Sequence, residues 1–139
     1  MPQPTLLSPS PSSSAILCVD DEVLILSSLK EQLRRRFGDR YLYETATCAD
    51  EAWVVIDELC TEGIDLLVIV SDWLMPGIKG DEFLAQVYQR HPRIATVLLT
   101  GQADESAIAR ARQQAHIRAC LSKPWCESEL AAVIESALG

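Results

Sequence analysis

Short apolar runs alternate with helix-length segments along the chain from residue 15 onward. Several runs are apolar at consecutive positions, as strands covered on both faces are. The runs are Ala15–Val19, Tyr41–Ala46, Asp65–Val70, Ile94–Leu99 and Arg118–Leu121. Helical spacing appears between them, because Leu26, Leu29 and Leu33 share one face of residues 23–37, and residues 127–138 carry a second apolar stripe.

This alternation predicts an α/β fold. Five strands that alternate with five helices imply a parallel sheet with helices on both faces. Right-handed crossovers favour a doubly wound, five-stranded sheet of order 2-1-3-4-5, in which ligands lie beyond the carboxyl ends of the first and third strands. Asp104 is the expected cap of the fourth helix, and Glu127 or Ser128 is expected to serve the first turn of the last helix.

The composition indicates one globular domain behind a tail of different character. The chain has 139 residues, of which 48% are hydrophobic. Residues 1–14 hold four of the seven prolines and five serines, so we expect a disordered tail at 1–14 and the folded domain at 15–139.

The net charge and the cysteines indicate which partners and which cellular location to expect. The net charge of −8 argues against direct binding to nucleic acid or to an anionic membrane. The sequence shows neither a basic segment ahead of an apolar stretch nor an apolar run near the ~20 residues of a membrane helix. The five cysteines include no C-x-x-C pair, so we expect reduced thiols and a cytoplasmic location.

Polar residues follow four of the predicted strands and share one rim of the sheet. They are Asp20-Asp21, Ser71-Asp72, Thr100-Gly101 and Ser122-Lys123. Each alone is a common helix start or turn, but together three carboxylates and one lysine sum to −2, which a divalent cation would neutralise. Oxygen ligands favour Mg²⁺. Asp72 could then attack phosphorus, while Thr100, Lys123 and the cation neutralise the phosphoryl oxygens.

Four segments together resemble the receiver domain of two-component response regulators. They are the segment over residues 16–22, the motif Asp72-Trp-Leu-Met-Pro-Gly, Thr100-Gly101 and Lys123-Pro124-Trp125, and the resemblance covers residues 15–138. It implies the flavodoxin-like (βα)₅ fold and a signalling switch that belongs to a phosphorelay. In that switch, Asp72 would accept a phosphoryl group from the phosphohistidine of a sensor histidine kinase or phosphotransfer protein.

The resemblance also assigns roles around Asp72. Asp21, Asp72 and the backbone carbonyl of Leu74 would ligate Mg²⁺, with Asp20 acting mainly through water. Thr100 would hydrogen-bond to the phosphoryl group, and Lys123 would ion-pair with it. The output surface would be formed by residues 104–115, 118–121 and 127–138, would regulate an output domain or effector protein, and could support a homodimer.

One position departs from the family pattern. The family often has Tyr or Phe three residues before the lysine, and that ring turns inward on activation, whereas this chain has Cys120. The aromatic half of the switch is therefore in question, while the Thr100 half is retained. We interpret Cys120 as a strand filler, since a redox role would need an exposed thiolate of low pKa.

Two other functions fit parts of the sequence. A phosphatase of the haloacid-dehalogenase class would need Asp-x-Asp after the first strand and a cap segment, and this chain has neither. A phosphorylation-independent interaction module with a receiver fold usually lacks part of the acidic set or the lysine. Because both are present here, the sequence favours a phosphoacceptor signalling domain over either an enzyme or a passive module.

Overall fold

The computed structural model describes residues 13–101 and 105–139, and five parallel strands form its centre. The strands are β1 (Ser14–Val19), β2 (Leu42–Ala46), β3 (Asp65–Asp72), β4 (Ala95–Thr100) and β5 (Ala119–Ser122). Their order in the sheet is β2-β1-β3-β4-β5, and every neighbouring pair is parallel. The predicted doubly wound topology is therefore confirmed.

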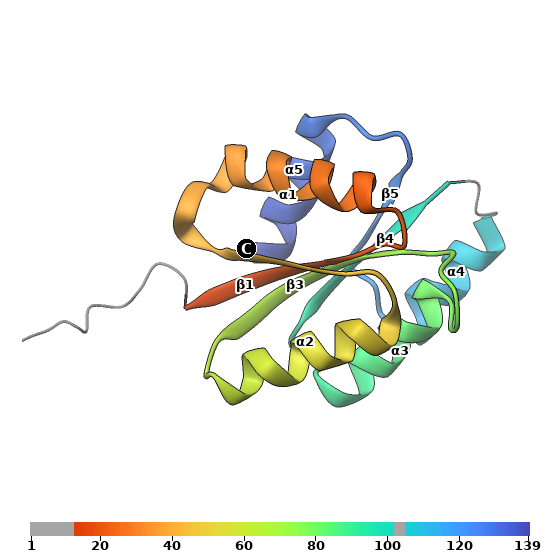
Figure 1. The fold of residues 1–139 in the computed structure, drawn as a ribbon. Helices are drawn as coiled ribbons and strands as arrows, with labels where there is room; N and C mark the ends of the chain where they lie inside the picture. The colour runs from red at the N-terminus through yellow and green to blue at the C-terminus, as the bar shows by residue number, and fades with distance from the viewer. Residues whose placement is uncertain (1–12, 102–104) are drawn as a thin grey trace, which may run out of the picture.

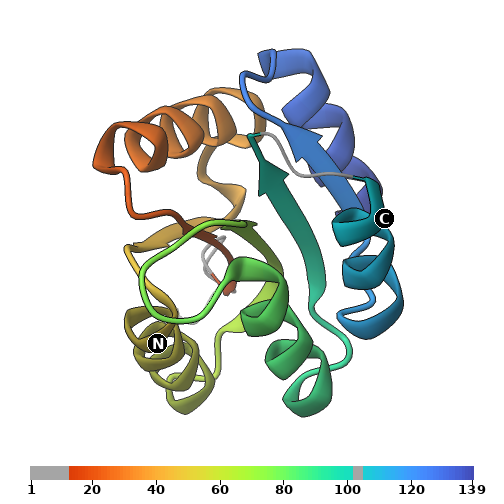
Figure 2. The ribbon, with the colours of Figure 1, turned by 90° about the vertical axis from the view of Figure 1, so that its right-hand side faces the viewer.

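Helices cover both faces of this sheet. They are α1 (Val23–Phe37), α2 (Ala49–Thr61), α3 (Gly80–Arg90), α4 (Glu105–Gln114) and α5 (Glu127–Leu138), and a 3₁₀ turn, η2 (Gly38–Arg40), follows α1. Figure 1 shows α1 and α5 on one face and α2, α3 and α4 on the other. Figure 2 shows the same two layers after a 90° turn, with α1 and α5 side by side.

The apolar stripes predicted from the sequence form a separate core on each face. On one face, Leu29 and Leu33 of α1 and Ile134 of α5 are fully or almost fully buried. On the other, Ile56 of α2 and Phe83 of α3 are completely buried. Strand residues alternate between the two cores, which explains why the strand runs are apolar at consecutive positions.

Some details differ from the pattern-based expectations. Strand β1 begins at Ser14, one residue earlier than expected, while Asp104 and residues 1–12 of the predicted tail lie outside the described residues. The residue before α5 is Cys126, whose backbone N–H donates to the Glu129 carboxylate at 3.1 Å. Glu127 and Ser128 lie in the first turn of the helix as expected, and the Glu129 carboxylate adds a bond at its start that was not predicted.

The length and polarity of the described helices bear on whether any of them could span a membrane. Within residues 13–101 and 105–139, each helix is too short or too polar to cross a bilayer.

Candidate functional site

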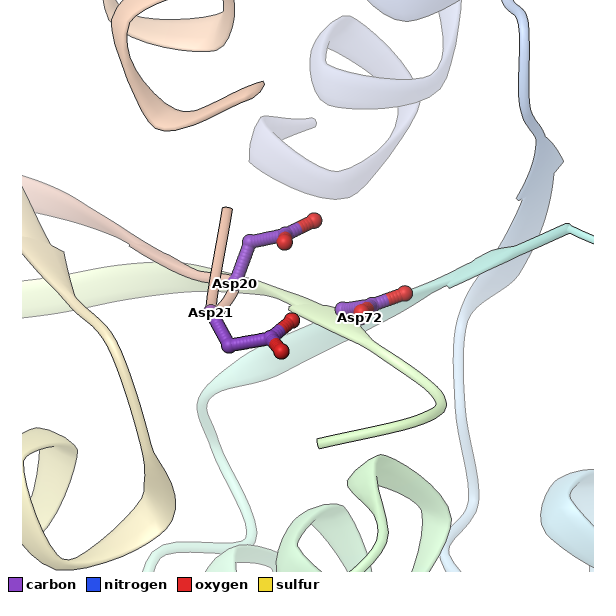
Figure 3. Close-up of side chains that lie close together, drawn as sticks. All are labelled: Asp20, Asp21 and Asp72. Carbon is purple, nitrogen blue, oxygen red and sulfur yellow. The ribbon is translucent and has the colours of Figure 1, made fainter. Parts of the chain in front are cut away.

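Three carboxylates meet at the carboxyl ends of the two central strands. Asp20 and Asp21 directly follow β1, and Asp72 is the last residue of β3. Because Val19 of β1 pairs with Ser71 of β3, the residues that follow them, Asp20 and Asp72, lie side by side at the same edge of the sheet. Figure 3 shows the three side chains converging, and one oxygen from each lies within 4.8 Å of the others. The predicted acidic cluster is therefore present.

Lys123 lies between two of these carboxylates. Its Nζ is 2.9 Å from Oδ2 of Asp20 and 3.1 Å from Oδ1 of Asp72. The other oxygen of Asp20 accepts the backbone N–H of Glu22 at 2.8 Å. Both oxygens of the fully buried Asp20 are thus engaged by the protein, whereas Asp21 is exposed at the rim.

Burial and charge shift the pKa values of Asp72 and Lys123. Burial raises the pKa of Asp72, and the charges of Asp20 and Asp21 raise it further, while Lys123 opposes the rise without cancelling it. Burial lowers the pKa of Lys123, but its hydrogen bonds and ion pairs with Asp20 and Asp72 outweigh burial, and the net pKa is raised. Lys123 therefore stays protonated at neutral pH.

The donor set fits a hard divalent cation. All three side chains offer oxygen atoms, which Mg²⁺ and Ca²⁺ prefer over the nitrogen and sulfur ligands typical of zinc. Asp21 and Asp72 border a solvent-open hollow of about 340 Å³, so water can complete a coordination shell there. The acidic cluster is thus consistent with a divalent metal site.

The same hollow collects most of the predicted site residues. Asp21, Asp72, Leu74 and Lys123 line it, together with Glu22, Trp73 and Gly101. Leu74 is 58% exposed, so its side chain lies outside the core. Leu74 also lines the hollow, so the residue whose backbone carbonyl is the predicted metal ligand lies at the site.

Thr100 and Lys123 are joined through the backbone. Thr100 ends β4, is buried, and accepts the backbone N–H of Lys123 through its carbonyl at 2.7 Å. The backbone N–H of Trp73 donates to the carbonyl of Leu99 at 2.9 Å, which fixes the turn after Asp72 against β4. The four predicted strand ends therefore lie on one rim.

Gly80 is a site residue that the sequence patterns did not single out. Its N–H donates to the carbonyl of Trp73 at 2.7 Å, and a Cβ at this position would collide with the backbone carbonyl of Asp72. Only glycine permits this approach. The sequence contains a glycine at this position, but no local pattern predicts that the backbone of Gly80 packs against that of Asp72.

Cys120 lies in β5 and packs against the core formed with α2, α3 and α4. Its thiol is half-buried, and burial raises its pKa, so it is protonated at neutral pH. These properties agree with the interpretation of Cys120 as a strand filler and not with a reactive thiolate.

Comparison with known protein families gives one match over most of the chain. Residues 16–135 match the model described as the response regulator receiver domain. Among curated relatives, the hydrogenase transcriptional regulatory protein HoxA of Cupriavidus necator is 30% identical over 129 residues, which cover 93% of this chain and 25% of that protein. The chain therefore spans about a quarter of the length of this relative.

Solved structures agree with the family match. The signal receiver domain of an HD domain-containing protein from Pseudomonas fluorescens Pf-5 superposes with a TM-score of 0.79 at 30% identity, covering 90% of this chain and 94% of that one. The beryllofluoride-activated NtrC4 receiver domain dimer gives a TM-score of 0.77 at 27% identity, covering 91% and 96%.

Proposed function

Since the chain belongs to the response regulator receiver family, we propose that it is a phosphorylation-controlled switch with Asp72 as the phosphoacceptor. The single observation that supports this most is the convergence of Asp21, Asp72 and Lys123 on one open hollow. Receiver domains pair with histidine kinases, so the donor is a phosphohistidine on a sensor kinase or a phosphotransfer protein.

The residues divide the work of binding a phosphoryl group. Asp21, Asp72 and the backbone carbonyl of Leu74 would hold Mg²⁺, whereas Asp20, whose two oxygens already bond to Lys123 and Glu22, would act through water. When bound, the cation neutralises negative charge on the transferring group. Lys123 turns from the Asp72 carboxylate to the phosphoryl oxygens, and the Thr100 hydroxyl donates to them.

Phosphoryl transfer itself is a displacement at phosphorus. A carboxylate oxygen of Asp72 forms the new bond to phosphorus as the bond from phosphorus to the histidine nitrogen breaks. The electron pair of the broken bond stays on that nitrogen, and the product is an acyl phosphate on Asp72. The protein contributes position and charge, so the domain is a phosphoacceptor rather than an enzyme with a separate substrate.

Output follows from contacts that form only with the phosphoryl group. Lys123 turns from Asp72 to bind it, and the Thr100 hydroxyl moves to donate to it, which shifts α4 relative to β5 and α5. That surface then regulates an output domain or effector protein, and a second copy of the chain is one candidate partner. Cys120 supplies no aromatic ring, so the switch relies on the Thr100 side.

A labelling experiment tests the assignment of Asp72. The chain is incubated with Mg²⁺ and radiolabelled acetyl phosphate, and hydroxylamine-labile label on the protein is counted. We expect Asp72→Ala to abolish the label and Asp57→Ala, which removes an exposed carboxylate from α2, to leave it unchanged. Undiminished label on Asp72→Ala would refute the site, and no label on the unmodified chain would favour a phosphorylation-independent interaction module.

A further inference from the structure

Lys123 is held in place from two sides. On its N-terminal side, strand pairing continues into the bond from its N–H to the Thr100 carbonyl at 2.7 Å. On its C-terminal side, only Pro124, Trp125 and Cys126 separate it from α5, which begins at Glu127. The side chain of Trp125 is half-buried and packs against the core shared by α1 and α5.

A hydrogen bond fastens this indole to α1. Nε1 of Trp125 donates to Oε1 of Gln32 at 2.8 Å, and Nε2 of Gln32 donates to the Ser28 hydroxyl one turn earlier on the same helix at 3.2 Å. The second bond fixes the orientation of the Gln32 amide, because it uses the nitrogen and leaves the oxygen facing the indole.

The helix that carries Gln32 also begins at the acidic pair. Its first residue is Val23, directly after the segment of Asp20, Asp21 and Glu22. Gln32 lies nine residues further, or about 14 Å along the helix axis. One helix therefore begins two residues after the acidic pair and bonds the lysine-bearing loop through Gln32.

We propose that Gln32 is a positioning residue for Lys123. The bond to Trp125 sets where the loop after β5 leaves the sheet, and thereby sets the reach of Lys123 toward Asp72 and toward a phosphoryl group on it. This inference rests on the proposed function and adds to it a residue far from the reacting atoms.

Two neighbouring ion pairs on α1 provide a contrast. Arg35 pairs with Glu127 at 2.6 Å, and Arg36 pairs with Glu135 at 3.0 Å, both between exposed side chains. Exposed pairs contribute little because water and salt screen them. The Arg36 pair joins α1 to the same C-terminal helix but at a point well beyond the loop, so its loss should not move Lys123.

The experiment measures the affinity for beryllofluoride, a phosphoryl mimic, at saturating Mg²⁺ with the full chain. We expect Gln32→Leu, which removes the acceptor, and Trp125→Phe, which removes the donor, each to weaken beryllofluoride binding about three- to tenfold, the equivalent of one hydrogen bond. Gln32→Glu keeps an oxygen for the indole and should stay within about twofold of the unmodified chain, as should Arg36→Gln.

Two further readouts separate positioning from a general loss of stability. The double variant should be no weaker than the weaker single variant, because both changes break the same bond. The Mg²⁺ affinity, followed by Trp73 emission, should change less than about twofold, since its ligands lie outside the loop. Effects that multiply in the double variant, or an equal loss with Arg36→Gln, would overturn the proposal.

The proposed function can fail independently of this inference. If the unmodified chain binds no beryllofluoride and takes no label, the phosphoacceptor assignment is wrong. If it binds normally and Gln32→Leu matches it within twofold, only the positioning role is wrong.

Discussion

Replacement of Lys123 by methionine tests the electrostatics of the site most directly. The change removes the cation that lies 2.9 Å from Asp20 and 3.1 Å from Asp72, while a chain of similar length fills the space. Each of these attractions is about 5 kcal/mol at an effective dielectric constant of 20, before the cost of burying the ammonium is subtracted. The variant leaves two buried carboxylates without their shared partner.

The expected loss of stability is large for one residue. Removal of one partner from a buried ion pair costs about 3–5 kcal/mol, and the open hollow beside Lys123, with 18% of its side chain exposed, favours the lower limit. We therefore expect a loss of about 3 kcal/mol in the free energy of unfolding. With a urea dependence of about 1.5–2 kcal/mol per molar, the midpoint falls by about 1.5–2 M.

Magnesium should reverse part of this loss. A bound divalent cation neutralises the same carboxylates, so its stabilising effect should be larger in Lys123→Met than in the unmodified chain. Urea unfolding is measured with EDTA and with saturating Mg²⁺.

Lys79→Met is the matched control for the lysine variant. It removes the same charge from a lysine that lies over the Trp73 ring and outside the carboxylate cluster, and it should cost less than about 1 kcal/mol. Equal losses in the two variants, or a loss that Mg²⁺ does not reduce, would refute the reasoning.

Three other predictions concern the same rim. Burial raises the folded-state pKa of Asp72, so its contribution to stability is fully present below the unfolded-state pKa of about 4 and is lost as the pH rises through the higher folded-state pKa. Asp72→Asn should therefore raise Tm at pH 7 in metal-free buffer, and calorimetry should show the gain shrinking as the pH falls toward about 4. A constant gain across this range would contradict the assignment of the shift. Gly80→Ala should lower the free energy of unfolding by about 1–3 kcal/mol and slow the labelling of Asp72, because the new Cβ meets the Asp72 carbonyl; unchanged urea curves would show that the turn adjusts freely. Leu74→Asn should shorten the lifetime of the acyl phosphate, because it replaces an exposed apolar side chain at the hollow with one that can orient water; equal decay rates would dismiss a shielding role for Leu74.

The topology and the site were predictable because both follow from local patterns. Parallel strands buried on both faces have consecutive apolar residues, and their carboxyl ends must share one edge of the sheet. Asp20, Asp21, Asp72 and Lys123 could therefore be placed together from their positions at strand ends, and the structure confirms that grouping.

Other features depend on contacts that no local pattern reveals. Gln32 and Trp125 are 93 positions apart in the sequence. A glutamine on an amphipathic helix usually faces solvent, so no sequence pattern predicts that the two residues pair. Glu127 and Ser128 lie in the first turn of α5 as the pattern predicts, but Cys126 before the helix is not a typical residue at that position and was not predicted. The approach of Gly80 to Asp72 depends on the path of a loop, which composition alone does not determine.

The separation of the two cores by the sheet has a mechanical consequence. Leu29 and Leu33 pack only in the layer of α1 and α5, whereas Phe83 and Ile56 pack in the layer of α2, α3 and α4 (Figure 1). A change in side-chain packing around α4 therefore needs no change in the packing around α1, because the sheet lies between the two layers. If the proposed switch acts through α4, the layer of α1 and α5 can keep the same packing in both states.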